Sequence, residues 1–398
     1  MIIIFYIFAV LQLFFSYKSF RSGLEYLHFF RREIAAPRIG YAPFVTVIAP
    51  CKGKDEGLRE NLSSLLNQDY PGYEVIFVVD DAADAALGVI EEASRETTII
   101  SRLVIASKAV NSGQKVENLR EAVLHANAAS QVFVSADSDI RVPTHWLSAL
   151  VAPLESKAIG ATTGYRWFVS GGFSLATALR SVWNASIASA LGPDMKTNFC
   201  WGGSTAIRRG TFERLDIREK WRGVLSDDFA LTRVLNEAGL SIRFVPQAIL
   251  PSFGECSFGG LLEFTNRQMK ITRVYSSRLW LQSFLGSGLY ILVMAWAIVI
   301  LFVLPPSSPY WLAAMLILLS VIALGTAKAA LRFKAVDLAL TTGVLNYRQH
   351  IFHLSLWLLT PFIFLINSAV ALFSRQVRWR GISYEMVSPS ETRVLERR

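Results

Sequence analysis

The chain has 398 residues, of which 52% are apolar, and its formal net charge is +9. The apolar share is above that of ordinary soluble domains and gathers at the two ends of the chain, which indicates membrane-embedded segments. The sequence has neither a long Lys/Arg tract nor zinc-finger spacing, so we expect no nucleic-acid partner, and its three cysteines show no CxxC pairing of the kind found in disulfide scaffolds or metal sites.

The N-terminal stretch 2–17 is apolar apart from Gln12 and Ser16, and basic residues follow it from Lys18 onward. A secretory signal would have a charged start and a small-residue cleavage site, and neither is present. A spanning helix needs about 20 residues, so we predict an uncleaved transmembrane anchor over residues 1–20. The basic flank predicts that the chain after Lys18 faces the cytoplasm.

Residues 43–256 alternate between short apolar runs and helical patterns, which predicts a cytoplasmic catalytic domain. Strands are expected over 45–49, 75–79, 102–106 and 132–136, and helices over 55–67, 85–93, 116–126, 173–191 and 229–238. Strands that are separated by helices predict βαβ units and a mostly parallel, Rossmann-like sheet, so the expected fold class is α/β.

The C-terminal third is basic and aromatic over 257–280 and then predominantly apolar over 281–373. We expect the first of these segments at the membrane interface and the second to supply transmembrane helices over 281–304, 310–327 and 351–373, the last interrupted by Pro361. Counting three crossings places the basic tail, residues 374–398, outside the cell, whereas the positive-inside rule places it in the cytoplasm. The two rules disagree.

Two predicted strands end in carboxylates, at Asp80, Asp81 and Asp84 and at Asp137-Ser138-Asp139. Ligands of open α/β sheets bind beyond the carboxyl ends of the strands. Asp137 and Asp139 offer hard oxygen ligands that suit Mg²⁺ or Mn²⁺ together with a diphosphate. The alternatives are a solvated turn for the triplet and a polar turn with a helix cap for the first group.

Asp228 is a candidate general base for a hydroxyl nucleophile, and its alternative role is a helix N-cap beside Asp227. Arg267, Lys270 and Arg273 recur at helical spacing. These cations could hold a leaving diphosphate or grip lipid headgroups.

Lys115 could reach a phosphate or be exposed. The stretch Trp201-Gly202-Gly203-Ser204 suits a sugar or acceptor pocket, or a packed turn. His125 and His145 lack metal-ligand spacing and are expected to be structural.

The combination of motifs resembles the ceramide glucosyltransferases, membrane enzymes of the glycosyltransferase family 21 type. The matching stretches are Pro50-Cys51-Lys52-Gly53-Lys54-Asp55, Gln68-Asp69-Tyr70-Pro71, Tyr73-Glu74-Val75, Asp137-Ser138-Asp139-Ile140-Arg141-Val142, Asp227-Asp228 and the basic motif at Arg267. The resemblance covers nearly the whole chain. It implies the GT-A nucleotide-diphospho-sugar transferase fold, an inverting mechanism, a UDP-sugar donor with glucose as the expected hexose, and a lipid acceptor such as ceramide.

The resemblance also implies roles for single residues. Asp81 and Asp84 would contact the nucleoside, with Lys115 near a phosphate, while Asp137 and Asp139 would hold the metal and diphosphate. Asp228 would be the base, and Arg267 and Lys270 would steady the leaving UDP. In the family's final motif, Lys270 and Ile271 stand here in place of Arg and Trp.

Two alternatives stay open. The acceptor could be another lipid, such as a hopanoid or polyprenyl phosphate; a processive polysaccharide synthase is disfavoured by the altered motif and the few spans. The chain could also be an inactive membrane scaffold that binds nucleotide or lipid, which the departures at Lys270 and Ile271 would support.

Overall fold

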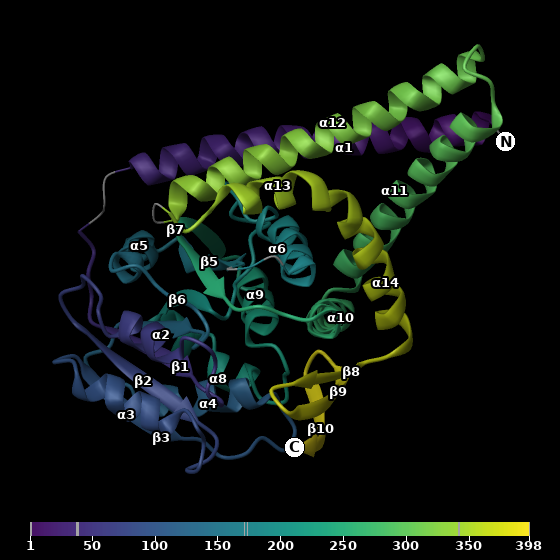
Figure 1. The fold of residues 1–398 in the computed structure, drawn as a ribbon. Coiled ribbons are helices and arrows are strands. Elements are labelled where there is room, and N and C mark those ends of the chain that lie inside the picture. The colour runs from purple at the N-terminus through teal and green to yellow at the C-terminus, as the bar shows by residue number, and fades with distance from the viewer. Residues whose placement is uncertain (1, 37–39, 171, 173, 341–342, 398) are drawn as a thin grey trace.

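The computed structural model describes residues 2–36, 40–170, 172, 174–340 and 343–397 (Figure 1). Within these ranges a seven-stranded sheet has the order β3-β2-β1-β4-β6-β5-β7, and β6 alone runs antiparallel to its neighbours. Its strands are β1 (Val45–Pro50), β2 (Tyr73–Val79), β3 (Ile100–Ile105), β4 (Val132–Ala136), β5 (Ile159–Val169), β6 (Ser204–Arg208) and β7 (Ser241–Phe253). The predicted mostly parallel α/β sheet is confirmed.

Helices cover both faces of the sheet because successive strand residues alternate between two apolar cores. Val45 and Val47 pack into one core and Ile48 into the other. The covering helices are α2 (Leu58–Leu65), α3 (Leu87–Arg95), α4 (Gln114–Ala122), α5 (Trp146–Val151), α6 (Leu175–Ala188), α7 (Arg209–Arg214), α8 (Ile217–Lys220) and α9 (Asp227–Glu237), with 3₁₀ turns η1 (Val123–His125) and η2 (Ala152–Glu155). Residue 173, where one predicted helix was to begin, lies outside the described residues.

The N-terminal helix α1 (Ile2–Ala35) is longer than the anchor predicted over residues 1–20. Lys18 and Arg21 lie inside it, because Lys and Arg are good helix formers and do not end a helix where the apolar stretch ends. Its second half lies beside α12 (Pro309–Ala339), where Tyr26 and Phe30 share an apolar cluster with Phe333 (Figure 1).

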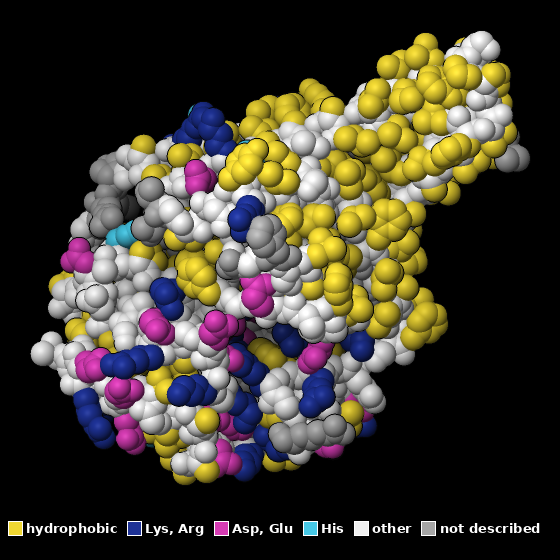
Figure 2. Space-filling view, in the orientation of Figure 1, with side chains coloured by type: hydrophobic (Ala, Val, Ile, Leu, Met, Phe, Trp, Pro, Cys, Tyr) yellow, Lys and Arg dark blue, Asp and Glu magenta, His cyan; other side chains and the backbone are white. Residues whose placement is uncertain are grey.

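Four helical segments of the described chain are long and apolar enough to cross a membrane: Ile2–Ala35, Ser277–Val303, Pro309–Ala339 and Tyr347–Phe373. The far ends of α1, α11 (Ser277–Val303) and α12 form an arm that projects from the part of the chain that carries the seven-stranded sheet (Figure 1). Hydrophobic side chains cover this arm, whereas charged side chains gather on the rounded remainder (Figure 2). This distribution indicates a membrane protein.

The fourth segment, Tyr347–Phe373, is broken into α13 (Tyr347–Ser355), η3 (Leu356–Leu359) and α14 (Thr360–Phe373). Near its start, His353 stacks on Trp167 of β5. At its other end, the carbonyl of Ala371 accepts a hydrogen bond from Arg273 of α10 (Phe258–Tyr275). Both ends of this segment therefore contact parts of the chain that pack with the seven-stranded sheet. The segment is long and apolar enough to cross a membrane, so the crossing expected over residues 351–373 stays a prediction.

The basic tail folds into a second sheet of β8 (Gln376–Trp379), β9 (Ile382–Ser388) and β10 (Glu391–Arg397). It packs against the catalytic domain next to α10 (Figure 1). Arg380 makes a two-pronged ion pair with Asp55, at 2.5 and 2.6 Å, and the Tyr384 hydroxyl accepts the backbone N–H of Gln114. The tail thus contacts the part of the chain that carries the seven-stranded sheet. The side of the membrane on which the tail lies stays a prediction.

Candidate active site

The acidic triplet follows β4 at the point where the strand order reverses. In the sheet, β1 lies between β2 and β4. The connections that follow β1 and β4 therefore leave the sheet in opposite directions, and a crevice opens beyond the carboxyl ends of these two strands. The triplet is held in place by backbone contacts: the N–H of Asp137 donates to the carbonyl of Gly203, and the carbonyl of Ser138 accepts from the Asn61 amide at 3.2 Å.

A cavity of about 1230 Å³ opens beyond these strand ends. Its walls bring together five of the residues singled out in the sequence, which are Lys115, Asp137, Asp139, Asp228 and Arg267. They come from α4, the turn after β4, the start of α9 and the middle of α10. Groups more than 100 residues apart therefore face one space.

Two cations neutralise the acidic triplet. Asp137 accepts from Lys115 Nζ at 2.8 Å and from Arg166 of β5 at 2.7 Å. The same guanidinium makes two 2.9 Å bonds to the two oxygens of Asp139. The ring of Trp201 lies 5.2 Å from the Arg166 guanidinium carbon, which fixes the cation against an aromatic wall.

These contacts set the charge state of the site. Burial raises the pKa of Asp137, but the charges of Lys115 and Arg166 outweigh it, so the net pKa is lowered. Burial lowers the pKa of Lys115, and Asp137 and Asp227 more than offset it, so its pKa is raised. The carboxylate and the ammonium are thus both charged at neutral pH.

The carboxylates of Asp137 and Asp139 are the type of ligand that a divalent cation prefers. Both side chains face the cavity, at 20% and 30% exposure for Asp137 and Asp139, and they offer the hard oxygens that Mg²⁺ and Mn²⁺ prefer. The described chain has no group of three or more His, Cys, Asp or Glu side chains placed to hold a metal. A metal here would take its remaining ligands from a diphosphate and water, and Arg166 would have to share the carboxylates.

Asp228 and Asp227 begin α9 but differ in their surroundings. One oxygen of Asp228 accepts from the Ser226 hydroxyl and, at 2.8 Å, from the backbone N–H of Phe229. Among the described residues its second oxygen accepts no hydrogen bond. Asp227 is buried, and burial raises its pKa to about 6 against the opposing charge of Lys115. Both carboxylates line the cavity, and Asp228 is the less buried of the two.

The Trp201-Gly202-Gly203-Ser204 stretch forms the turn before β6 and lines the same cavity through Trp201. A Cβ atom on Gly202 would lie 2.2 Å from the Asp227 carboxylate and 2.8 Å from Lys115 Nζ. Only glycine allows this approach, so the turn serves both packing and the pocket wall.

Of the two α10 cations predicted to steady a leaving diphosphate, only Arg267 lines the cavity. Its guanidinium lies between the rings of Phe264 and Trp379, at 5.6 and 5.4 Å, and burial lowers its pKa to about 10. Lys270 instead donates to the Ser374 hydroxyl and the Gln376 carbonyl of the tail. Contact between Lys270 and a diphosphate stays a prediction. The two hydrogen bonds of Lys270 to the tail, outside the cavity lining, do not favour it.

Asp81 and Asp84 lie at the edge of the site, outside the lining of the cavity. Asp81 is exposed and pairs with Lys108 at 2.8 Å, which lowers its pKa. Asp84 accepts the N–H groups of Gly53 and Ala86, both at 2.8 Å, and so orders the loop after β1. Their predicted contact with a nucleoside stays a prediction.

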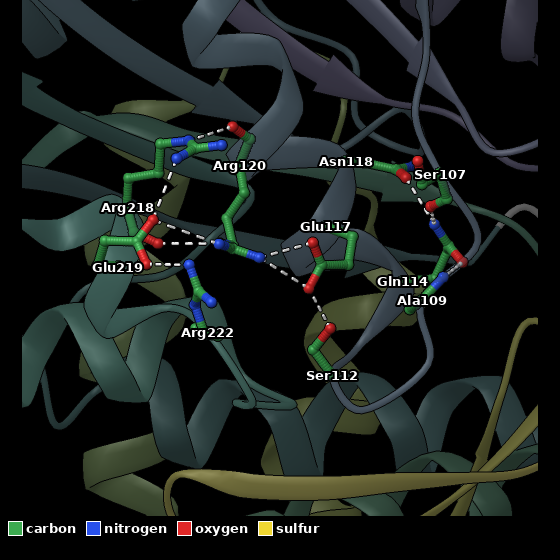
Figure 3. A network of polar contacts seen from close by, with 10 residues as sticks. All are labelled: Ser107, Ala109, Ser112, Gln114, Glu117, Asn118, Arg120, Arg218, Glu219 and Arg222. Atoms are coloured by element: carbon green, nitrogen blue, oxygen red, sulfur yellow. Dashed lines mark hydrogen bonds and ion pairs between the residues drawn. The ribbon is translucent and has the colours of Figure 1, made fainter.

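Lys115 owes its position to the anchoring of α4. The amide of Gln114 bonds to Ala109, Ser107 and Asn118 and fixes the loop before the helix (Figure 3). Farther along, Arg120 pairs with Glu117 and donates to the carbonyl of Arg218 in α8, which in turn donates to the carbonyl of Arg120 (Figure 3). Both ends of α4 are therefore held.

The sequence did not indicate Arg166, Trp379 or Arg380, although all three line the cavity. Arg166 is an isolated charge within a long strand, and such a residue carries no local pattern. The Arg380-Gly381 pair joins β8 and β9 directly, so it was a detectable turn signal within a segment predicted only as a basic tail.

Another part of the cavity is lined by three apolar helices, of which α11 leads into the membrane arm. Trp183 of α6, Gly286 and Tyr290 of α11, and Phe364 of α14 line this part. The same cavity thus extends from the carboxylates to apolar helices, and two of these, α11 and α14, belong to candidate membrane spans. A molecule with a polar head and apolar chains matches both ends.

Comparison with known proteins adds the following. The sequence profile described as "Glycosyl transferase family 21" matches residues 6–391. Hyaluronan synthase from Streptococcus pyogenes is 30% identical over 125 residues, which is 30% of this chain and 29% of the synthase, so the chain spans under a third of that relative.

Two solved structures are also similar. The mannosyltransferase PcManGT from Pyrobaculum calidifontis, solved with GDP-Man and Mn²⁺, has a TM-score of 0.47 and 17% identity over 92% of this chain and 99% of its own. Glucosyl-3-phosphoglycerate synthase from Mycobacterium tuberculosis has a TM-score of 0.39 and 14% identity over 61% of this chain and 86% of its own. On the match across nearly its whole length, the chain belongs to glycosyl transferase family 21.

Proposed function

We propose that this protein is an inverting hexosyltransferase that moves glucose from UDP-glucose to the primary hydroxyl of ceramide or a similar membrane lipid. The observation that carries the proposal is the single cavity that joins Asp137, Asp139 and Asp228 to α11 and α14. Membership of the family supports glycosyl transfer. The donor and the lipid rest on the resemblance of the motifs to ceramide glucosyltransferases.

In the proposed reaction, the acceptor oxygen attacks the anomeric carbon from the face opposite the diphosphate. Asp228, whose free oxygen faces the cavity, takes the hydroxyl proton as the new C–O bond forms. The bond from the sugar to the β-phosphate breaks, and its electron pair leaves with UDP. Arg267, held between two aromatic rings, lies where it can stabilise that charge.

Asp137 and Asp139 would hold a divalent cation, Mg²⁺ or Mn²⁺, together with the donor diphosphate. When bound, such an ion supplies positive charge to the departing diphosphate. Lys115 keeps Asp137 ionised and oriented through its 2.8 Å contact, and Asp81 and Asp84 would complete the nucleoside end of the site.

We further propose that the catalytic domain faces the cytoplasm and that α1, α11 and α12 cross the membrane. The proposal is supported by Arg21 in α1 and by Lys328 and Lys334 in α12, all in the halves of these helices nearer the catalytic domain.

The test is an assay of the purified full chain with a panel of UDP-sugars and lipids, with added Mn²⁺ and with EDTA. We expect transfer to ceramide, loss of transfer in EDTA and recovery with excess metal. Transfer to another lipid would replace the acceptor. The absence of transfer to every lipid, with nucleotide binding retained, would favour the scaffold alternative.

A further inference from the structure

The tip of the β8–β9 hairpin reaches the wall of the active-site cavity. Trp379 and Arg380 both line the cavity, although they lie more than 100 residues after Arg267. The strands are joined by Arg380 and Gly381, whose φ angles are +51° and +77°. Positive φ at both central residues is the type I′ turn that matches the twist of a hairpin.

Arginine is an unusual residue at such a position. A side chain in the left-handed region crowds its own backbone, so Asn, Asp or Gly are the common choices there. Among the described residues, Arg380 and Asp216 are the non-glycine residues with positive φ. Strain of this kind concentrates at functional sites, where another requirement selects the residue.

The hairpin is seated firmly on α10. Ile271 is buried against Val377, Ile382 and Tyr384, and Lys270 holds the start of β8 through the Gln376 carbonyl. The two residues that depart from the family's final motif are therefore the seat of the C-terminal sheet. The sheet in turn places Trp379 against the Arg267 guanidinium, at 5.4 Å.

The charge around Arg380 is balanced by a residue outside the cavity lining. Asp55, in the loop between β1 and α2, holds the guanidinium at 2.5 and 2.6 Å and keeps it oriented. Burial lowers the pKa of Arg380, and the ion pair with Asp55 raises it. The charges of Asp139 and Asp137 raise this pKa further, so the guanidinium lies within electrostatic reach of the acidic triplet.

We propose that Arg380 is a donor-binding residue whose guanidinium contacts the diphosphate of the sugar nucleotide, beside Arg267, and that the C-terminal sheet is a wall of the active site. This inference rests on the proposed function and adds a residue to its site. Arg267 has no carboxylate within ion-pair distance in the described chain, so these two cations together offer charge for an anionic ligand.

The experiment measures binding of UDP and of uridine to the full chain in detergent by titration calorimetry. We expect Arg380→Gln to weaken UDP binding by about 10- to 100-fold, the size of a lost charged contact, and to change uridine binding less than about twofold. Arg380→Lys keeps the charge but loses the planar fork, so we expect a smaller loss, and it serves as the test if Arg380→Gln does not fold.

Two controls separate ligand contact from support of the hairpin. Arg378→Gln alters an exposed neighbour outside the cavity lining and should leave UDP binding unchanged. Asp55→Asn breaks the same ion pair but leaves the Arg380 charge, so UDP binding should fall less than about threefold. Equal UDP binding by wild type and Arg380→Gln, or equal losses in Arg380→Gln and Asp55→Asn, would overturn the inference. A wild type that binds neither UDP nor GDP would instead contradict the proposed function.

Discussion

At the scale of single residues, the site is a set of acids whose environments differ. Asp137 and Asp139 are neutralised by Arg166, Asp227 is buried beside Lys115, and Asp228 keeps one oxygen free. Differences of this kind assign different tasks to chemically identical groups. The oxygen of Asp228 that accepts no hydrogen bond among the described residues is available to receive a proton at the cavity.

Asp228→Asn tests that assignment. The amide cannot accept the acceptor proton, so we expect kcat to fall by about 10²- to 10⁴-fold. UDP binding should change little, because the variant keeps the side-chain shape and the hydrogen bond from Phe229 N–H. Turnover close to that of wild type, measured with radiolabelled donor, would remove Asp228 as the base.

Asp227 gives a pH-dependent stability prediction. Its pKa rises from 3.8 to about 6 on folding, so the folded state binds this proton more tightly than the unfolded state. Its stabilising contribution is complete below about pH 4 and is lost as the pH rises through about 6. A shift of about two units corresponds to roughly 3 kcal/mol.

Asp227→Asn removes that titration. We expect the thermal midpoint of the variant, relative to wild type, to be higher at pH 7.5 than at pH 4.5. Thermal unfolding in detergent at the two pH values measures the difference, and a constant gap between the proteins would show that Asp227 does not titrate in this range.

At the scale of elements, helix α10 carries two different tasks on two faces. Arg267 lines the cavity, and Lys270 holds the C-terminal sheet from outside the cavity lining. Ile271 packs against the sheet and also lines the cavity. The altered motif is therefore consistent with a changed structural partner and is not by itself a sign of lost activity. The C-terminal sheet in turn places the ring of Trp379 and the guanidinium of Arg380 at the cavity.

Ile271→Ala should loosen that sheet. The side chain is buried, so its loss should reduce the free energy of unfolding by about 2–5 kcal/mol and expose the tail to trypsin at Arg375 and Arg378. Limited proteolysis compares the variant with Leu262→Ala, an exposed position on the same helix. Equal cleavage of the tail in both variants would contradict the proposed seat.

Some elements could be predicted from the sequence and others could not. Strand β4 matches its prediction of 132–136 because a buried strand in a parallel sheet is a continuous apolar run with a sharp polar end. The end of α1 was missed because its basic residues are good helix formers. The packing of α13 against the sheet depends on contacts such as His353 with Trp167, which link distant parts of the chain.

Some residues of the site could likewise be predicted from the sequence, and others could not. Asp137, Asp139 and Asp228 could be placed at one cavity because the ends of strands and the starts of helices are marked locally. Arg166 and Arg380 reach that cavity through tertiary packing alone, from mid-strand and from a hairpin tip. Local patterns cannot carry such information.

At the scale of the whole molecule, the catalytic domain, the membrane arm and the tail sheet share one cavity. Its lining includes the acidic triplet as well as residues of α11 and α14. An enzyme that joins a water-soluble donor to a lipid needs this arrangement, because the reacting hydroxyl must reach the donor while the acyl chains stay near the bilayer.

Gly286 offers a direct way to close the apolar end of the cavity. It lines the cavity on α11, and a Cβ atom built there meets nothing within 4 Å, so a large side chain would enter open space without a clash at its base. The matched control is Leu285→Trp, one position away on the exposed surface of the same helix.

The measurement is transfer of labelled glucose from UDP-glucose to ceramide in proteoliposomes that contain wild type, Gly286→Trp or Leu285→Trp. The account predicts that Gly286→Trp lowers lipid glucosylation at least about tenfold while UDP binding changes less than about twofold, and that Leu285→Trp matches wild type. Undiminished glucosylation by Gly286→Trp would contradict the claim that the lipid reaches the carboxylates through this cavity.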